Sequence, residues 1–361
     1  KTRGTTYKNV HGITRKGIKI CMSDEPYKHL EKRKLIINGI GSYNYVFYDK
    51  AGEFGITQSP MTIIEPSENT LRFIQSPLFH FITNATKIIG NNLNKKTSLF
   101  LLLTFIWSWT FWLIGLSHLT EEITQEAIGK FLVFFFTGIY GPTVSALLTT
   151  VIFDGLKGTL TLLKKLLIWK VPLKNYLFII LLPLIFVLIG IGFYSLSIGD
   201  IGSFDKMAFL SIPTVLWAGF YAGPLGEELG WRGFLLPEFQ KRFSNFKSAI
   251  LIGIIWFVWH IPLFWAPFGT LVSGETITIL PVVTYFIMLI CLSIIITWLA
   301  INSKGSVLIA ILFHLSINAG IALLFFPELN MDFKKVHLLS SIGILMFTGI
   351  LIAKNKLKTS A

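Results

Sequence analysis

The chain has 361 residues, of which 53% are hydrophobic and 14% are charged, and its formal net charge is +13 at pH 7. Soluble domains carry about 25% charged residues, so this composition excludes an ordinary soluble protein and indicates a membrane protein. In so apolar a chain, excess lysine and arginine is typical of cytoplasmic loops beside anionic lipid, and we expect no nucleic-acid partner. The two cysteines, Cys21 and Cys291, form no CxxC pair, which argues against a disulfide framework.

The N-terminal part, residues 1–97, is polar and basic, and its first sixty residues show no clear hydrophobic periodicity. The chain begins with Lys1 rather than Met, and Met61 is an alternative start. We therefore expect this region to be partly disordered or not native, and we give residues 1–60 little functional weight.

The second part, residues 98–353, is predicted to be an all-α membrane domain, and a basic cytoplasmic tail, 354–361, follows it. Its apolar runs are long enough to cross a bilayer and lack the alternation of strands. We expect about eight transmembrane helices, at 98–118, 130–153, 175–197, 207–234, 247–267, 278–301, 306–326 and 336–353.

The connections between these runs differ in charge. Lysine and arginine gather before the first run, in every second connection and after the last run, which by the positive-inside rule places both termini in the cytoplasm. Residues 156–170 are predicted to form a basic amphipathic helix at that surface. The chain is also rich in Lys, Asn, Ile and Phe, as in AT-rich bacterial genomes, so we expect a multi-pass protein of a bacterial plasma membrane.

Three charges interrupt the run at 207–234, in the stretch "GPLGEELGWRGF". An ionised side chain inside the bilayer costs about 2.5–3.5 kcal/mol on insertion scales, so such residues pair, face a cavity or do chemistry. Glu228 and Arg232 are spaced i, i+4 and are predicted to form an ion pair. Glu227 is rotated by about 100° from Glu228, so it is the carboxylate left without this partner.

Two other runs carry polar residues at a similar depth. Counted at about 1.5 Å per residue, Glu227 and His260 lie ~20 Å from the cytoplasmic helix ends, and His314 lies ~14 Å in. Asn318 follows His314 at i, i+4 and shares its helix face. The sequence therefore predicts one shared polar site. The other histidines are expected outside it, in loops, at span ends or in the N-terminal region: His11, His29, His80, His118 and His337.

The chain has neither a GxSxG nucleophile elbow nor an HExxH zinc motif. Catalysis would therefore use glutamate and histidine directly, with a carboxylate that takes a proton from water and polar groups that hold an oxyanion. A zinc ion on Glu227, His260 and His314 is an alternative, because two histidines and one carboxylate form a known catalytic zinc set.

Three motifs stand in order along the chain: EExxxR at Glu227, Glu228 and Arg232, an FxxxH-like motif at Trp256 and His260, and HxxxN at His314 and Asn318. Together they resemble the CAAX-protease and bacteriocin-processing family, also called the Abi family, of glutamate-type intramembrane peptidases. The resemblance covers about residues 98–353. Trp256 stands where the family has phenylalanine, a departure that we expect to affect packing beside the histidine.

The resemblance implies a role for each matching position. Glu227 would activate water together with His260, while His314 and Asn318 would stabilise the oxyanion. The other two charges of the first motif would orient the site. No cofactor is implied, and the partners would be a peptide or protein substrate at the membrane and the bilayer itself.

The sequence thus predicts a membrane peptidase. Two alternatives from other classes stay open: a non-catalytic immunity or scaffold protein of the membrane, and a proton-coupled transporter that uses Glu227 and the histidines as a relay.

Overall fold

The computed structural model divides the chain into two units, Lys1–Ala85 and Thr86–Ala361, and each is described by itself. In the first unit the structure describes five short strands. In the second it describes residues 94–119, 124–198, 206–221, 223–274, 277–322 and 332–357.

The strands of the first unit form two small antiparallel sheets. One pairs β1 with β2, and the other has the order β4-β3-β5, with Ile36 of β3 opposite Phe47 and Thr62. Their bounds are Arg3–Thr6, Lys19–Met22, Lys34–Asn38, Tyr45–Asp49 and Pro60–Ile64. They lie in the region for which the sequence predicted no regular structure.

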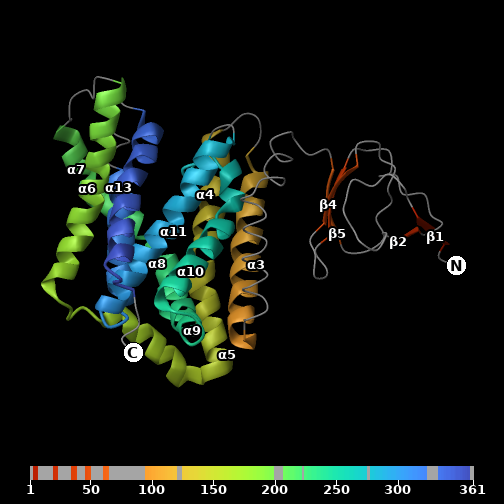
Figure 1. The fold of residues 1–361 in the computed structure, drawn as a ribbon, viewed down its shortest axis with the longest axis horizontal. Coiled ribbons are helices and arrows are strands. Elements are labelled where there is room, and N and C mark those ends of the chain that lie inside the picture. Colours follow the sequence, from red (N-terminus) through yellow and green to blue (C-terminus); the bar gives the residue numbers. More distant parts are fainter. Residues whose placement is uncertain are drawn as a thin grey trace. The chain divides into compact units, whose positions relative to one another are not determined.

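The second unit is helical in every regular element that the structure describes, so the predicted all-α membrane bundle is confirmed there (Figure 1). Its longer helices are α3 (Lys95–Ser117), α4 (Gln125–Ile139), α5 (Gly141–Lys164), α6 (Leu173–Ile198), α7 (Lys206–Tyr221), α10 (Asn245–Trp259), α11 (Ile279–Asn302), α12 (Val307–Ala322) and α13 (Phe333–Ala353). Between α7 and α10 lie α8 (Pro224–Glu228), a π-helix (Leu229–Leu235) and α9 (Leu236–Gln240).

Five helical segments are long and apolar enough to cross a membrane, so the chain is a multi-pass membrane protein. They are Lys95–Ser117, Gln125–Leu167, Leu173–Ser197, Ile279–Asn302 and Lys335–Ala353. Two shorter apolar helices, Asn245–Trp259 and Val307–Gly320, lie where two further spans were predicted. On α3 and α6 large apolar side chains such as Leu102 and Ile180 are exposed, which suits contact with lipid.

The prediction of one continuous span over 207–234 is wrong. α7 ends at Tyr221, and a new helix begins at Pro224. Proline has no backbone N–H to continue a helix and disfavours the helical conformation in the residue before it, so the break falls at Gly223. The break matters for function, because the three charges follow it directly.

The end of α5 bends sideways and runs beneath the other helices, at the bottom of the view in Figure 1. Gly155 interrupts the helix with φ +66° and ψ −169°, a conformation that glycine adopts without strain. Residues 156–164 are helical beyond this kink, and Leu156 and Leu160 are exposed while Leu162 is buried. The predicted amphipathic helix over 156–170 is therefore present in its first part, whereas residues 168–170 are not helical.

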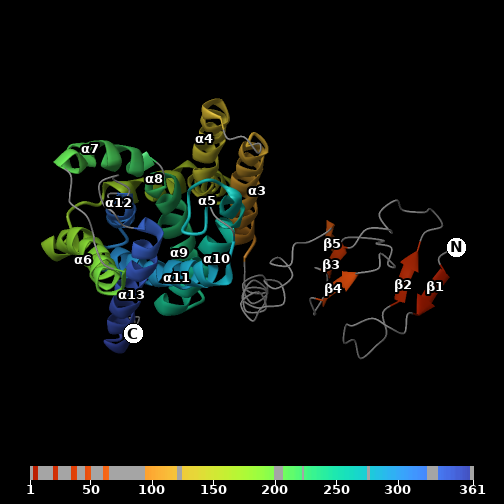
Figure 2. The same ribbon diagram turned by 90° about the horizontal axis from the view of Figure 1, so that it is seen from above.

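The helices enclose a core rich in tryptophan. α12 packs against α6, α7, α8 and α11, α10 packs against α11, and α3 packs against α4 and α5 (Figure 2). Trp112, Trp231, Trp256 and Trp259 are among the largest side chains that are fully buried. The bundle therefore places α8, α10 and α12 around one interior volume.

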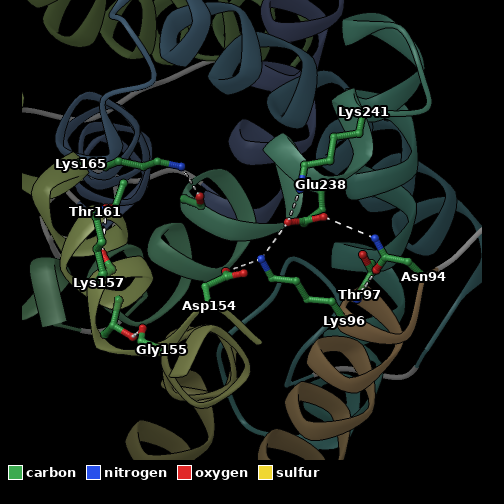
Figure 3. A network of polar contacts seen from close by, with 12 residues as sticks. Asn94, Lys96, Thr97, Asp154, Gly155, Lys157, Thr161, Lys165, Glu238 and Lys241 are labelled. Atoms are coloured by element: carbon green, nitrogen blue, oxygen red, sulfur yellow. Dashed lines mark hydrogen bonds and ion pairs between the residues drawn. The ribbon is translucent and has the colours of Figure 1, made fainter. Parts of the chain in front are cut away.

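A charged network ties three elements together at one end of the bundle (Figure 3). Glu238 of α9 pairs with Lys96 of α3 at 3.0 Å and with Lys241 at 2.7 Å, and Lys96 also pairs with Asp154 of α5. Burial of Glu238 opposes its ionisation, but hydrogen bonds from Lys241 and Lys96 hold the pKa of its carboxyl below the ordinary value.

A second contact joins the kinked end of α5 to the π-helix. Lys165 Nζ donates a 2.6 Å hydrogen bond to the carbonyl oxygen of Gly233 (Figure 3). In an α-helix this carbonyl would accept from the backbone N–H of residue 237, which is Pro237 and has none. The lysine gives this carbonyl, on the residue directly after Arg232, a hydrogen-bond donor that Pro237 cannot be.

Candidate active site

The site begins with the short helical segment that carries the three charges. α8 and the π-helix pack closely against the start of α5. A Cβ on Gly230 would lie 2.5 Å from Cβ of Pro142, so glycine is required for this approach. A π-helix within an otherwise α-helical segment frequently marks a functional site.

Glu228 is at the centre of a buried ionic cluster. Its Oε1 accepts hydrogen bonds from Arg232 Nη1 at 3.0 Å and from His314 Nδ1 at 2.8 Å. The side chains of Glu228 and Arg232 have no exposed surface. The guanidinium carbon of Arg232 also lies 5.0 Å from the ring centroid of Trp256, a cation–π contact. The ion pair expected from the i, i+4 spacing is therefore present, and it extends to α12.

Glu227 faces a different partner. Its Oε2 accepts a 2.6 Å hydrogen bond from the indole Nε1 of Trp256, and the residue is 4% exposed. Tryptophan was expected to differ from the family's phenylalanine in packing alone, and that expectation is wrong. Phenylalanine has no N–H, so this hydrogen bond depends on the tryptophan.

His260 follows the last residue of α10. Its Nδ1 lies 2.7 Å from the carbonyl oxygen of Trp256. Because a carbonyl can only accept, Nδ1 carries the proton, and the neutral ring has its lone pair on Nε2. The rings of Trp259 and Tyr285 hold the imidazole edge-on, with centroids at 4.7 and 5.7 Å. The local structure thus presents His260 as an acceptor.

Three side chains converge on the backbone of Gly223. A Cβ built there would lie 3.1 Å from Glu227 Oε1, 3.4 Å from Asn318 Nδ2 and 4.0 Å from His314 Nε2. A carboxylate oxygen, an amide nitrogen and an imidazole nitrogen therefore surround one small space, which the absence of a side chain on Gly223 leaves open.

A cavity of about 310 Å³ has these three side chains, Glu227, His314 and Asn318, in its wall. The predicted residues that line it are Glu227, Trp256, His260, His314 and Asn318. Glu228 and Arg232 do not line it but support it from behind through His314 and Trp256. Much of the remaining wall is apolar, with Trp112, Phe135, Leu263, Met288 and Leu292 among its residues.

Polar lining residues that were not predicted include Thr270, Tyr285 of α11 and His337 of α13. His337 was expected outside the site, at a span end, and that expectation is wrong. It lies one turn inside α13, which packs against α11, and the side chain lines the same cavity as Glu227. In the sequence, the indication of this role was a histidine at the start of the apolar run at 336–353.

Within the described part of the chain, no three His, Cys, Asp or Glu side chains are placed so that they could hold one ion. Nδ1 of His260 and Nδ1 of His314 are both engaged in hydrogen bonds.

Residues 208–320, which hold all three motifs, match the family described as Type II CAAX prenyl endopeptidase Rce1-like. This part of the chain is similar to the CAAX-protease and bacteriocin-processing family. The chain is also 38% identical over 98 residues to CAAX prenyl protease 2 of Methanococcus maripaludis. The aligned part covers 27% of this chain and 36% of that relative.

Both similarities agree with the resemblance found in the motifs. The matched residues run from α7 to α12 and so include the break at Gly223, the ionic cluster and both motif histidines. They end before α13, so His337 lies outside the matched part.

Proposed function

We propose that the chain is an intramembrane peptidase that cleaves a membrane-associated peptide by metal-free, glutamate-assisted attack of water. The observation that carries the proposal is the convergence of Glu227 Oε1, His314 Nε2 and Asn318 Nδ2 beside Gly223. A peptide carbonyl in this space would have a base on one side and hydrogen-bond donors on the other, as amide hydrolysis requires.

In the first step a water molecule attacks the carbonyl carbon. Glu227 takes one proton of the water as the new C–O bond forms, and Nε2 of His260 accepts a hydrogen bond from the other. The carbonyl oxygen becomes an oxyanion, to which Asn318 Nδ2 donates. In the second step the C–N bond breaks, and the proton held by Glu227 moves to the leaving amine.

The contact between His314 and Glu228 bears on the oxyanion. An ionised carboxylate can only accept, so Nδ1 of His314 carries a proton. For Nε2 to donate as well, the ring must hold a proton on each nitrogen. Glu228 therefore acts as a positioning residue that prepares His314 to donate, while Arg232 holds the carboxylate in place.

We extend the proposal to the whole region 98–353 as the catalytic domain, with both chain termini in the cytoplasm and the protein in a plasma membrane. The substrate class is a peptide or protein segment held at the bilayer. The name of the relative, a CAAX prenyl protease, makes a C-terminal protein segment one candidate substrate.

The test compares wild type, Glu227→Gln and Glu228→Gln in detergent on a pool of quenched peptides, with and without a chelator. We expect Glu227→Gln to lower kcat by about 10²–10⁴-fold, the usual contribution of a general base, and to keep its melting temperature. Chelation is expected to leave wild-type cleavage unchanged.

Loss of activity on chelation with recovery on adding zinc would replace the metal-free mechanism by a metal-dependent one. Equal activity of Glu227→Gln and wild type would remove Glu227 as the base.

A further inference from the structure

His337 carries a polar atom that the proposed chemistry does not use. Its Nε2 is buried and has no hydrogen-bond partner among the described residues. The side chain lines the cavity that also holds Glu227, His260 and His314, and it reaches that cavity from α13, outside the three motifs.

A buried nitrogen without a partner destabilises the folded protein by an amount comparable with a lost hydrogen bond. A phenylalanine of similar shape would avoid that cost in a wall that also contains Met288, Leu289 and Leu292. Since no described residue satisfies this nitrogen, a group that enters the cavity can supply the partner that the histidine lacks there.

The volume and the lining of the cavity limit which ligands can enter it. Its volume of about 310 Å³ is at the lower end of the range for ligand sites, roughly 300–1,000 Å³, so it takes a short segment rather than a folded element. The apolar wall suits an aliphatic or aromatic side chain, and the neutral imidazole can exchange one hydrogen bond with a backbone N–H or C=O group. An extended peptide with an apolar side chain offers both.

From these observations we infer that His337 and the apolar wall of α11 form a peptide-binding subsite, in which His337 hydrogen-bonds to the substrate backbone beside the scissile bond. The inference rests on the proposed function and deepens it. His337 binds substrate without taking part in proton transfer, so its removal affects the binding of the peptide more than the chemical step.

The experiment uses three variants of the full chain in detergent. His337→Phe keeps the ring shape and removes hydrogen bonding, and His337→Gln keeps a polar atom near the position of Nε2. His118→Phe is the matched control, because His118 stacks on Phe134 at 5.4 Å and does not line the cavity.

The kinetics are measured on the single peptide of the quenched pool that wild type cleaves fastest. We expect His337→Phe to raise KM about fivefold to tenfold, the usual effect of one lost hydrogen bond, with kcat within about twofold of wild type. Its melting temperature is expected to stay equal or to rise, since the unpaired nitrogen is gone. His337→Gln and His118→Phe are expected to keep the wild-type KM.

An unchanged KM in His337→Phe, or a fall in its melting temperature that His337→Gln shares, would overturn the inference, because either result describes a structural histidine. A binding measurement separates the two proposals. The same peptide, labelled with fluorescein, is bound to Glu227→Gln and to the double variant Glu227→Gln/His337→Phe. Weaker binding after His337→Phe supports the subsite even if Glu227 proves not to be the base. If both proteins bind the peptide equally while wild type cleaves it, the subsite is overturned and the proposed function stands.

Discussion

The indole nitrogen of Trp256 lies 2.6 Å from Oε2 of Glu227, and the carbonyl oxygen of the same tryptophan lies 2.7 Å from Nδ1 of His260. One residue thus orients both groups that are proposed to activate water. The side chain of Trp256 donates to Glu227, and its main-chain carbonyl accepts from His260. A substitution of this side chain therefore removes the contact with Glu227 and keeps the contact with His260.

Trp256→Phe should therefore lower kcat about tenfold while the fold is kept. The variant leaves the carbonyl that holds His260 in place but frees the Glu227 carboxylate to rotate, and misplacement of a reacting group is costly. Steady-state kinetics on a cleaved peptide measure the effect, with the exposed Trp169 changed to phenylalanine as control. Wild-type kcat in Trp256→Phe would mean that the hydrogen bond does not contribute to catalysis.

Gly223→Ala should abolish most activity with little loss of peptide binding elsewhere in the cavity. The added methyl group would lie 3.1 Å from Glu227 Oε1 and 3.4 Å from Asn318 Nδ2, in the space proposed for the scissile carbonyl. A displacement of about 1 Å can cost roughly a hundredfold in rate. Gly129→Ala is the control, because nothing lies within 4 Å of its new Cβ. Full activity of Gly223→Ala would place the reacting carbonyl elsewhere.

Arg232→Met should destabilise the protein strongly, by about 3–5 kcal/mol, because it leaves the fully buried carboxylate of Glu228 without its permanent counter-charge. The double variant Glu228→Gln/Arg232→Met should lose less than the sum of the two single changes, since the two residues interact directly. Thermal unfolding in detergent is measured for wild type, the two single variants and the double variant, which together form a double-mutant cycle. Additive losses would show that the pair contributes no coupling energy.

The Glu238 network should stabilise the protein in a pH-dependent way. The folded-state pKa of this carboxyl lies below its ordinary value of 4.5, so its stabilising contribution is present above that pH and is lost as the pH falls through the folded value. The difference in melting temperature between wild type and Glu238→Gln should be largest at neutral pH and should shrink below about pH 4.5.

Glu126→Gln is the control for this comparison, because its pair with Lys130 is solvent-exposed and such pairs contribute little. A difference for Glu238→Gln that does not change with pH would assign the effect to packing instead of charge.

The parts of the site that the sequence predicted follow from local spacing and depth. The i, i+4 rule is enough to pair Glu228 with Arg232, and counting residues along helices is enough to bring Glu227, His260 and His314 to one level. Both are properties of single helices, so they do not require knowledge of how the helices pack.

The missed features depend on contacts between helices or on irregular backbone. Whether the Trp256 side chain only packs or also donates a hydrogen bond to Glu227 depends on how α8 lies relative to α10. His337 joins the cavity because α13 packs against α11. The Gly-Pro dipeptide at 223–224 indicated a break in the helix. The surrounding stretch is long and apolar, however, so hydropathy alone predicted one continuous span.

The π-helix at Leu229–Leu235 has a consequence for chain length. Each residue turns an α-helix by about 100°, and a π-helix, with its i→i+5 hydrogen bonds, turns by less. The segment therefore sets the angle between Glu227 at the cavity and Glu238 at the charged end. Deleting or inserting one residue between them would swing Glu238 away from Lys96 and Lys241, or else turn Glu227 away from Trp256. A change in the number of residues would uncouple the reactive carboxylate from the network that anchors its helix.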